Sequence, residues 1–423
     1  MKVSLAPSAL APPALTPIVP VLAATVGNAM EWFDLAAYGF FAVPISQAFF
    51  PAADPTASLL LTLAAFAVSY LARPVGALVL GAYADRHGRK AALMISIWLM
   101  ALGTLAIAIT PTYASIGVIA PTCVVLARLV QGFSAGGEFG PGVALLFESS
   151  KRRGGLLASW MLASQALSTI MAAALGVALT RLLSPADLQS WGWRVPFVIG
   201  LLIAPAGYLV RRHVHEPEQA SVPALAPLSY LASMCKRALL IGIGAIVIST
   251  SATYFLVYLP VYASQTLGLG AIVGFEAALL AGFVLFTLTP IFGAMSDRIG
   301  RRGPMLTAAF LMALIVVPLV HTLAQHPSTN MLFFAVLCLA LLKAVYQGSL
   351  AGFLAELFPT RLRASGINIA YNICIPIFGG LFPLTQTWLI KTTGDAAAPS
   401  MYLATAALLS LTSLCLVKSR ARP

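Results

Sequence analysis

A ten-residue polar motif occurs twice in this chain, and each copy lies between two long apolar runs. Residues 81–90 read GAYADRHGRK, and residues 293–302 read GAMSDRIGRR. A loop of this kind places glycine where two helices approach closely, aspartate beside a helix end and basic residues on the cytoplasmic face of a membrane. Glu148 and Glu356 form a second echo, because basic side chains follow each of them closely. The sequence therefore predicts a membrane protein built twice from one plan.

The composition points the same way. Hydrophobic residues make up 60% of the 423 residues, charged residues make up only 9%, and the mean hydropathy is +0.92. At about 20 apolar residues per helical span, the chain predicts an all-α membrane protein with twelve transmembrane helices in two pseudo-symmetric six-helix bundles. The expected spans are residues 18–45, 57–81, 91–110, 115–146, 155–180, 193–211, 238–263, 271–295, 305–324, 330–357, 364–389 and 400–417.

Proline-rich segments indicate where the two bundles begin and end. Residues 1–17 carry four prolines and cannot form a regular helix, so we expect a disordered tail there rather than a cleaved signal peptide. Three prolines in residues 214–236 predict a cytoplasmic linker between the two bundles. The predicted N-terminal bundle is 18–213, the predicted C-terminal bundle is 237–418, and 419–423 is a short tail.

The basic residues are distributed very unevenly among the loops. If the N-terminus is cytoplasmic, nineteen lysines and arginines fall on the cytoplasmic side, against Arg181 and Lys391 on the outer side. The positive-inside rule then predicts that both termini are cytoplasmic, and we expect a multi-pass protein of the cell inner membrane. The net charge of +12 describes this topology, so we expect the lipid bilayer and no nucleic acid as a partner.

Cysteine and histidine residues give no sign of a metal or redox site. The five cysteines are far apart without a C-x-x-C pair, and the five histidines fall in loops or at helix ends. We expect no metal site and no cofactor. No nucleophile and base share a span at a spacing that would allow catalysis, so we do not expect an enzyme. Separately, we expect a functional monomer.

Ionisable side chains inside the predicted spans are few, and each costs about 2.5 to 3.5 kcal/mol to insert. Such charges tend to mark a transport pathway. Glu31 and Asp34 share one helix face, where two crowded carboxylates favour a bound proton. We predict that the proton-carrying group is among Glu31, Asp34 and Glu138. The alternative for Glu31 and for Asp34 is a fixed structural pair with Arg73 or Arg128.

The basic residues at comparable depth predict an anion site. Arg128 lies one turn from Gln131 and offers a bidentate fork for a carboxylate, while Arg73 and Lys343 add two further charges. Polar residues of the second half are expected to complete the substrate site, although packing is their default role: Tyr346, Gln347 and Asn372. A stripe of glycines in the span of Arg128 predicts tight helix packing: Gly132, Gly136 and Gly140.

The duplicated motif and its acidic echoes are expected to control opening and closing. Charged residues at helix ends can make and break contacts as two bundles move against each other. The predicted gating residues are Asp85, Arg86, Arg89, Asp297, Arg298, Arg301, Glu148 and Glu356.

The doubled motif, together with Arg128, Gln131 and Gly132, resembles the signatures of the major facilitator superfamily. Within that superfamily, four stretches resemble the metabolite:proton symporter family: GNAMEWFD at 27–34, RPVG at 73–76, GGE at 136–138 and WGWRVPF at 191–197. FGGL at 378–381 and KTTGD at 391–395 are similar to the citrate and tricarballylate symporters. The chain departs from the pattern at Pro141, where the family more often has glycine, and at Lys343, where those citrate carriers have an uncharged residue.

The resemblance implies two bundles that rock about a central cavity and bind substrate between them. It implies proton-coupled uptake of a di- or tricarboxylate, citrate-like or tricarballylate-like, by alternating access. Three bases exceed what a zwitterion such as betaine requires, so the partners expected first are a small organic acid and protons. The alternatives are symport of 2-oxoglutarate, itaconate, shikimate or proline/betaine, and a proton-driven exporter of the same fold. A non-transporting receptor is a further, weaker alternative.

Overall fold

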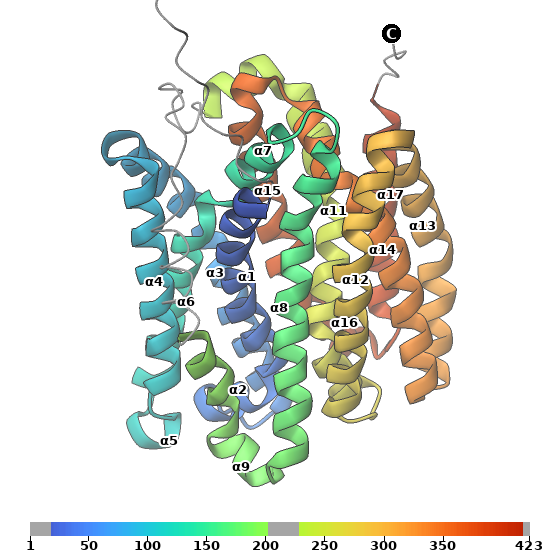
Figure 1. Ribbon diagram of the computed structural model, residues 1–423. Helices are drawn as coiled ribbons and strands as arrows, with labels where there is room; N and C mark the ends of the chain where they lie inside the picture. The colour runs from blue at the N-terminus through green and yellow to red at the C-terminus, as the bar shows by residue number, and fades with distance from the viewer. Residues whose placement is uncertain (1–17, 202–227, 418–423) are drawn as a thin grey trace, which may run out of the picture.

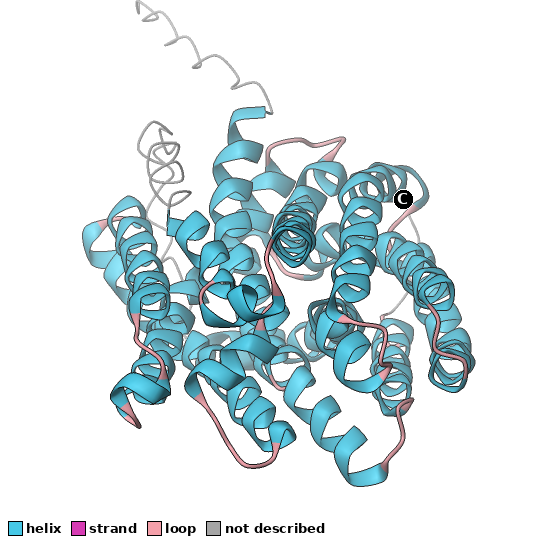
Figure 2. Ribbon diagram, turned by 90° about the horizontal axis from the view of Figure 1, so that it is seen from below, coloured by secondary structure: helices cyan, strands magenta, loops and turns pink. Residues whose placement is uncertain are grey.

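The computed structural model describes residues 18–201 and 228–417 of the chain. Within these ranges every regular element is a helix and no strand occurs (Figure 2). Most of the long helices run side by side along one common direction (Figure 1). An apolar helix satisfies all its backbone hydrogen bonds internally, which is the requirement for a segment that crosses lipid.

The first half contains α1 (Ile18–Phe40), α2 (Ala42–Phe49), α3 (Pro55–His87), α4 (Arg89–Ile109), α5 (Tyr113–Ile116), α6 (Ile119–Ser134), η1 (Ala135–Gly137), α7 (Phe139–Glu148), α8 (Gly154–Leu182), α9 (Pro185–Ser190) and η2 (Gly192–Arg194). A further helix covers residues 195–201, where the described range stops. The second half contains α11 (Leu228–Val261), η3 (Tyr262–Thr266), α12 (Ala271–Ile299), α13 (Arg302–Gln325), α14 (Thr329–Leu357), η4 (Thr360–Leu362), α15 (Arg363–Ile375), η5 (Pro376–Gly380), α16 (Phe382–Thr393) and α17 (Ala398–Cys415).

Nine helices of the described chain are long and apolar enough to cross a membrane, and Met94–Ile109 is a shorter apolar helix. The helical run from α1 through α2 and the helix that starts at residue 195 fall at the two remaining predicted spans. Helix α11 begins at Leu228, inside the segment predicted as linker, and non-helical dihedral angles at Cys235 separate that first stretch from the rest of α11. The predicted tails and residues 214–227 of the linker lie outside the described residues.

The span that carries Arg128 is broken into α6, the short 3-10 helix η1 and α7. Its glycines lack side chains because other helices occupy that space. A Cβ atom on Gly132 would lie 2.8 Å from the Ser69 Cα of α3, and one on Gly140 would lie 2.7 Å from the Asn368 backbone nitrogen of α15. The glycine stripe is therefore a contact surface that faces its own half at one end and the opposite half at the other.

The two halves contact each other over most of their length. Helix α8 packs along α12, α1 packs against α11, and α7 packs against α15. Figure 1 shows α7 and α15 together at one end of the molecule, while α5 and α9 lie at the opposite end. The end with α7 and α15 is the one that we predict to be cytoplasmic. The helix contacts between the halves enclose the polar side chains that lie between them.

Candidate functional site

Glu31 and Arg73 form a buried ion pair near the middle of the first half. Arg73 Nη2 lies 2.7 Å from Glu31 Oε1 and also donates to the Ala135 carbonyl oxygen at 3.0 Å. Arg73 is only 2% exposed and Glu31 is only 6% exposed. Helix α3 supplies Arg73, and α1 supplies Glu31. Arg73 Nε and Nη1 have no hydrogen-bond partner among the described residues, so part of this guanidinium remains available to a further acceptor.

Arg128 of α6 is fully buried, and its immediate neighbours carry no charge. Its guanidinium donates to Gln131 Oε1 and to Ser69 Oγ, both at 3.0 Å. The guanidinium carbon lies 4.4 Å from the centre of the Tyr38 ring and 5.2 Å from that of Phe66, close enough for cation–π attraction. No ion pair to Arg128 occurs within the part of the chain that the structure describes. A buried cation without a direct ion pair is costly, and an incoming anion would compensate it.

Asp34 is connected to Arg128 through two uncharged side chains. The Thr104 hydroxyl of α4 donates to Asp34 Oδ2 and accepts a hydrogen bond from Gln131 Nε2 at 3.0 Å. Gln131 in turn accepts from Arg128, which completes the chain. Asp34 Oδ1 has no hydrogen-bond partner among the described residues. The acid and the base are therefore linked without direct contact.

The three predicted proton-coupling acids, Glu31, Asp34 and Glu138, line one cavity inside the first half. It measures about 40 Å³ and lies between α1, α4 and the α6–η1 region. This is enough room for water, since a single water needs roughly 10 to 15 Å³ of such volume. Hydroxyl groups of Ser96, Thr104 and Ser134 also line the cavity. The structure thus brings these acids together around a space where protons could be delivered by water.

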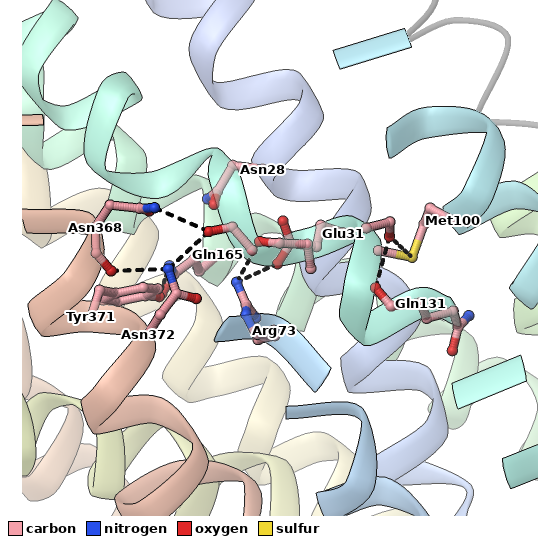
Figure 3. Close-up of polar contacts among 12 residues, drawn as sticks. Asn28, Glu31, Arg73, Met100, Gln131, Gln165, Asn368, Tyr371 and Asn372 are labelled. Atoms are coloured by element: carbon pink, nitrogen blue, oxygen red, sulfur yellow. Dashed lines mark hydrogen bonds and ion pairs between the residues drawn. The ribbon is translucent and has the colours of Figure 1, made fainter. Parts of the chain in front are cut away.

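The second half meets this region through amide and aromatic side chains. Asn368 and Asn372 of α15 both donate to the Gly136 carbonyl oxygen of η1, at 3.2 and 2.8 Å. Tyr371 accepts a hydrogen bond from Gln165 of α8 at 2.9 Å and stacks on Phe139. Figure 3 shows Asn368, Tyr371 and Asn372 grouped on one side of the Glu31–Arg73 pair. The break at η1 exposes the carbonyl group that the asparagines bind.

An aromatic cluster forms a second contact between the halves. The Tyr254 ring of α11 lies 5.3 Å from the Tyr70 ring and 5.9 Å from the Trp32 ring, measured between centres. A small cavity of about 10 Å³ between the halves is bordered by Trp32, Tyr254 and Tyr371. The side chains that a substrate would meet between the halves are therefore mostly closed over in this conformation.

Lys343 does not join Arg73 and Arg128, contrary to the expectation that the three bases face one cavity. Its ammonium donates to Gln347 Oε1 at 2.5 Å on the next turn of α14. It borders a separate apolar cavity of about 10 Å³ inside the second half, between α11, α13, α14 and α17. Tyr346, another predicted substrate residue, donates its hydroxyl to the Ala245 carbonyl oxygen at 2.6 Å. The sequence placed Lys343 correctly within a membrane-length helix, but it did not show which face of that helix the side chain lies on.

The predicted gating residues of the second half form one network with the first half. Asp297 accepts hydrogen bonds from the Gly155 and Leu156 backbone N–H groups at 2.8 and 2.9 Å, so its carboxylate caps the first turn of α8. Arg301 lies 3.0 Å from Asp297 and 2.9 Å from Glu356. These contacts join α12, α14 and α8 at the end that we predict to be cytoplasmic.

Glu148 pairs across the halves with Arg363, a residue that was not among the predicted gating residues. The sequence signal was present, because Arg363 follows Glu356 as basic residues follow Glu148. Arg86 and Arg298 are exposed. The side chains of Asp85 and Arg89 lie outside what the structure describes. Ser69, Thr104 and Asn368 were also missed, since uncharged residues in apolar spans carry little signal.

Ion pairs also join the halves at the opposite end. Arg181 of α8 lies 2.6 Å from Glu276 of α12, and Lys391 of α16 pairs with Asp54, just before α3. The hydrogen bond from Lys391 and the backbone N–H of Thr56 lower the pKa of the Asp54 carboxyl below its usual value. With contacts at both ends, the structure is a closed conformation.

Comparison with known proteins agrees with this architecture. The Major Facilitator Superfamily model matches residues 14–383. A citrate-proton symporter from Klebsiella pneumoniae is 36% identical over 406 residues, covering 95% of this chain and 91% of the relative. A proline/betaine transporter from Escherichia coli strain K12 is 32% identical over 422 residues, covering 95% of this chain and 84% of the relative.

Solved structures show the same fold. A partially occluded, inward-open conformation of the xylose transporter XylE from E. coli has a TM-score of 0.77 with this chain at 16% identity, covering 96% of this chain and 99% of that one. The predicted all-α fold of twelve transmembrane helices is thereby confirmed. The chain belongs to the Major Facilitator Superfamily.

Proposed function

We propose that this protein is a proton-coupled symporter that takes up an organic acid with two or three carboxylate groups by alternating access. Citrate and tricarballylate are the acids expected first. The observation that carries the proposal is Arg128, a fully buried guanidinium whose hydrogen-bond partners are all uncharged. A second guanidinium, on Arg73, keeps two nitrogen atoms without a described partner. Bidentate pairing with carboxylates is the interaction that this group makes best.

Coupling follows from competition for Arg73. While Glu31 is ionised it occupies one side of the Arg73 guanidinium, at 2.7 Å. A proton on Glu31 would weaken this pair and leave Arg73 free to bind a substrate carboxylate. Anion binding and proton binding then favour each other, which is the linkage that a symporter requires. Asp34 and Glu138, on the same cavity, are further candidates for the proton-carrying group.

The relatives include carriers of both anionic and zwitterionic substrates, so the charge of the site has to discriminate. The K. pneumoniae relative is a citrate-proton symporter, and the E. coli relative is a proline/betaine transporter. A zwitterion brings its own cation and would leave one of the two guanidinium groups uncompensated. A di- or tricarboxylate satisfies both, so this site favours the organic acid.

The decisive experiment is uptake by purified protein in proteoliposomes with an imposed pH gradient. We expect labelled citrate or tricarballylate to accumulate when the outside is acidic and to stop accumulating when a protonophore is added. Proline and betaine should not compete at tenfold excess. Accumulation of betaine but of no acid would refute the anion assignment, and movement of acid against the expected direction would favour the exporter.

The Arg128→Lys variant tests the residue that carries the proposal. Lysine keeps the charge but loses the fork, so we expect citrate affinity to fall about tenfold or more. Thr287→Val is the control, because Thr287 is an exposed residue of α12 whose hydroxyl bonds only to carbonyl groups of its own helix. Equal affinities for wild type and Arg128→Lys would remove Arg128 from the substrate site.

We also propose that the protein lies in the cell inner membrane as a functional monomer with both termini cytoplasmic. The unequal distribution of basic residues between the two sides supports this orientation. Reporter tags after Pro423 and near Ala220 should both be active only in the cytoplasm. Activity of either tag on the outer face would contradict the topology.

A further inference from the structure

Hydrogen bonds lead from Asp34 through Thr104 and Gln131 to Arg128. Thr104 is the link next to Asp34, and its hydroxyl has a single proton. Its side chain is 1% exposed and lies on α4, between α1 and α6. Two acceptors lie within reach of that proton: Asp34 Oδ2, and the Met100 carbonyl oxygen at 3.0 Å. A hydroxyl carries one hydrogen, so it can donate to only one of them at a time.

The protonation state of Asp34 decides between the two acceptors. An ionised Asp34 only accepts, so the Thr104 hydroxyl must donate to it. A protonated Asp34 can donate to the Thr104 oxygen, and the hydroxyl can then turn to the Met100 carbonyl group. In both states the Thr104 oxygen accepts from Gln131 Nε2, so Gln131 senses the change through one atom.

The change reaches Arg128 because hydrogen bonds in a chain polarise one another. When Asp34 is ionised, its charge strengthens the bond from Gln131 to Thr104 and fixes the amide whose oxygen binds Arg128. When Asp34 is protonated, this hold weakens. The charged groups near this hydrogen-bond chain are Glu31, Arg73, Glu138 and Arg128 itself, and Glu31 and Glu138 border the same cavity as Thr104.

We propose that Thr104 is a positioning residue that couples the protonation state of Asp34 to the release of Arg128 for a substrate carboxylate. The inference rests on the proposed function, and it adds a second route of coupling to that through Glu31 and Arg73. Asp34 borders the 40 Å³ cavity, where it can exchange a proton with water, and Thr104, which borders the same cavity, transmits the result to Gln131 and Arg128.

The test compares Thr104→Val with Thr104→Ser and with the Thr287→Val control. Valine keeps the shape of threonine and removes the hydroxyl, whereas serine keeps the hydroxyl. The measurement is the half-saturating citrate concentration in counterflow exchange, at pH values from 5.5 to 8.5 and equal on both sides of the membrane. Because all variants are compared at the same pH, the ionisation of citrate itself cancels.

In Thr104→Val the hydrogen-bond chain from Asp34 to Arg128 is interrupted, so the part of the pH dependence of citrate affinity that Asp34 contributes should be lost and the alkaline limb of the profile should flatten. Thr104→Ser should restore the wild-type profile, and the control should match wild type throughout. In an Asp34→Asn background, adding Thr104→Val should not change the pH dependence further, because position 34 no longer titrates.

Three outcomes would overturn the inference. They are a wild-type profile in Thr104→Val, an equal flattening in Thr104→Ser, and a further change in the Asp34→Asn background. If Thr104→Val proved too unstable to purify, Gln131→Leu interrupts the same chain one residue later and should flatten the pH dependence of citrate affinity. Failure of wild type to exchange any organic acid would instead contradict the proposed function, so the two failures are distinguishable.

Discussion

The two halves of this protein share a fold but treat charge in opposite ways. The first half buries Glu31, Asp34, Arg73 and Arg128, and the two acids border one cavity. In its described part, the second half buries one charged side chain, Lys343, in an apolar setting. The two halves therefore have similar helical folds, but the groups able to exchange protons and bind anions are concentrated in the first half.

The second half contributes a different kind of surface. It meets the first half with the amides of Asn368 and Asn372 and with the rings of Tyr254 and Tyr371. Such groups make directional contacts without a net charge. The difference indicates that the first half carries the charged groups of the site, while the second half covers them with uncharged polar and aromatic side chains.

The largest expected effect tests whether proton coupling belongs to the first half alone. Glu31→Gln removes one member of a buried ion pair, and we expect pH-driven citrate accumulation to fall about 100-fold while exchange at equal pH partly survives. Glu276→Gln is the matched change in the second half, where the partner Arg181 has a 63% exposed side chain. It should alter accumulation less than twofold. A large loss in Glu276→Gln and a small one in Glu31→Gln would contradict the assignment of proton coupling to the first half.

A second prediction concerns the surface where the halves meet. In Gly140→Ala the new methyl group would meet the backbone of α15, and overpacking of this kind weakens a contact by about 1 to 3 kcal/mol. We expect uptake to fall about tenfold. The distance between spin labels at positions 149 and 361 should lengthen. Gly137→Ala is the control, since its Cβ would meet nothing within 4 Å. Unchanged distances in Gly140→Ala would mean that this contact does not hold the halves together.

A third prediction asks whether the lone cation of the second half is used. Lys343→Met replaces a buried charge with an apolar side chain of similar length, a change that is often neutral or stabilising. We expect citrate uptake within about twofold of wild type and an equal effect on mono-, di- and tricarboxylates. A selective loss of tricarboxylate uptake would show that Lys343 reaches the substrate in another conformation. The division between the halves would then be less sharp.

The smallest effect is expected at the outer contact between Asp54 and Lys391. Asp54→Asn should change uptake less than twofold, because both side chains are more than 40% exposed. The pKa of Asp54 is lowered, so the folded protein favours its ionised form. Its contribution is present above the usual aspartate pKa and is lost only as the pH falls through the lowered value. The wild-type and Asp54→Asn pH profiles should therefore run parallel from pH 5.5 to 8.5.

The sequence predicted the membrane-spanning helices and the acids that border one cavity, for physical reasons. Buried charges and doubled polar loops are conspicuous in an apolar chain, so the spans and the grouping of Glu31 with Asp34 could be anticipated. The rotation of Lys343 away from Arg73 and Arg128 could not, because helix packing decides which face of α14 turns inward. Thr104, Ser69 and Asn368 were missed for a related reason. Their importance comes from the neighbours that tertiary structure supplies.

The two hydrogen bonds from Asn368 and Asn372 to Gly136 also indicate how much free energy this contact contributes to the closed conformation. A hydrogen bond contributes a net 0.5 to 1.5 kcal/mol, so losing both on opening costs about 1 to 3 kcal/mol. That corresponds to odds of roughly 5:1 to 150:1 in favour of the closed contact. A carrier has to visit both of its open states in every cycle, and odds of this size can be reversed by one substrate that prefers the other state. A pair of fully buried salt bridges at the same place would hold the protein in a single state.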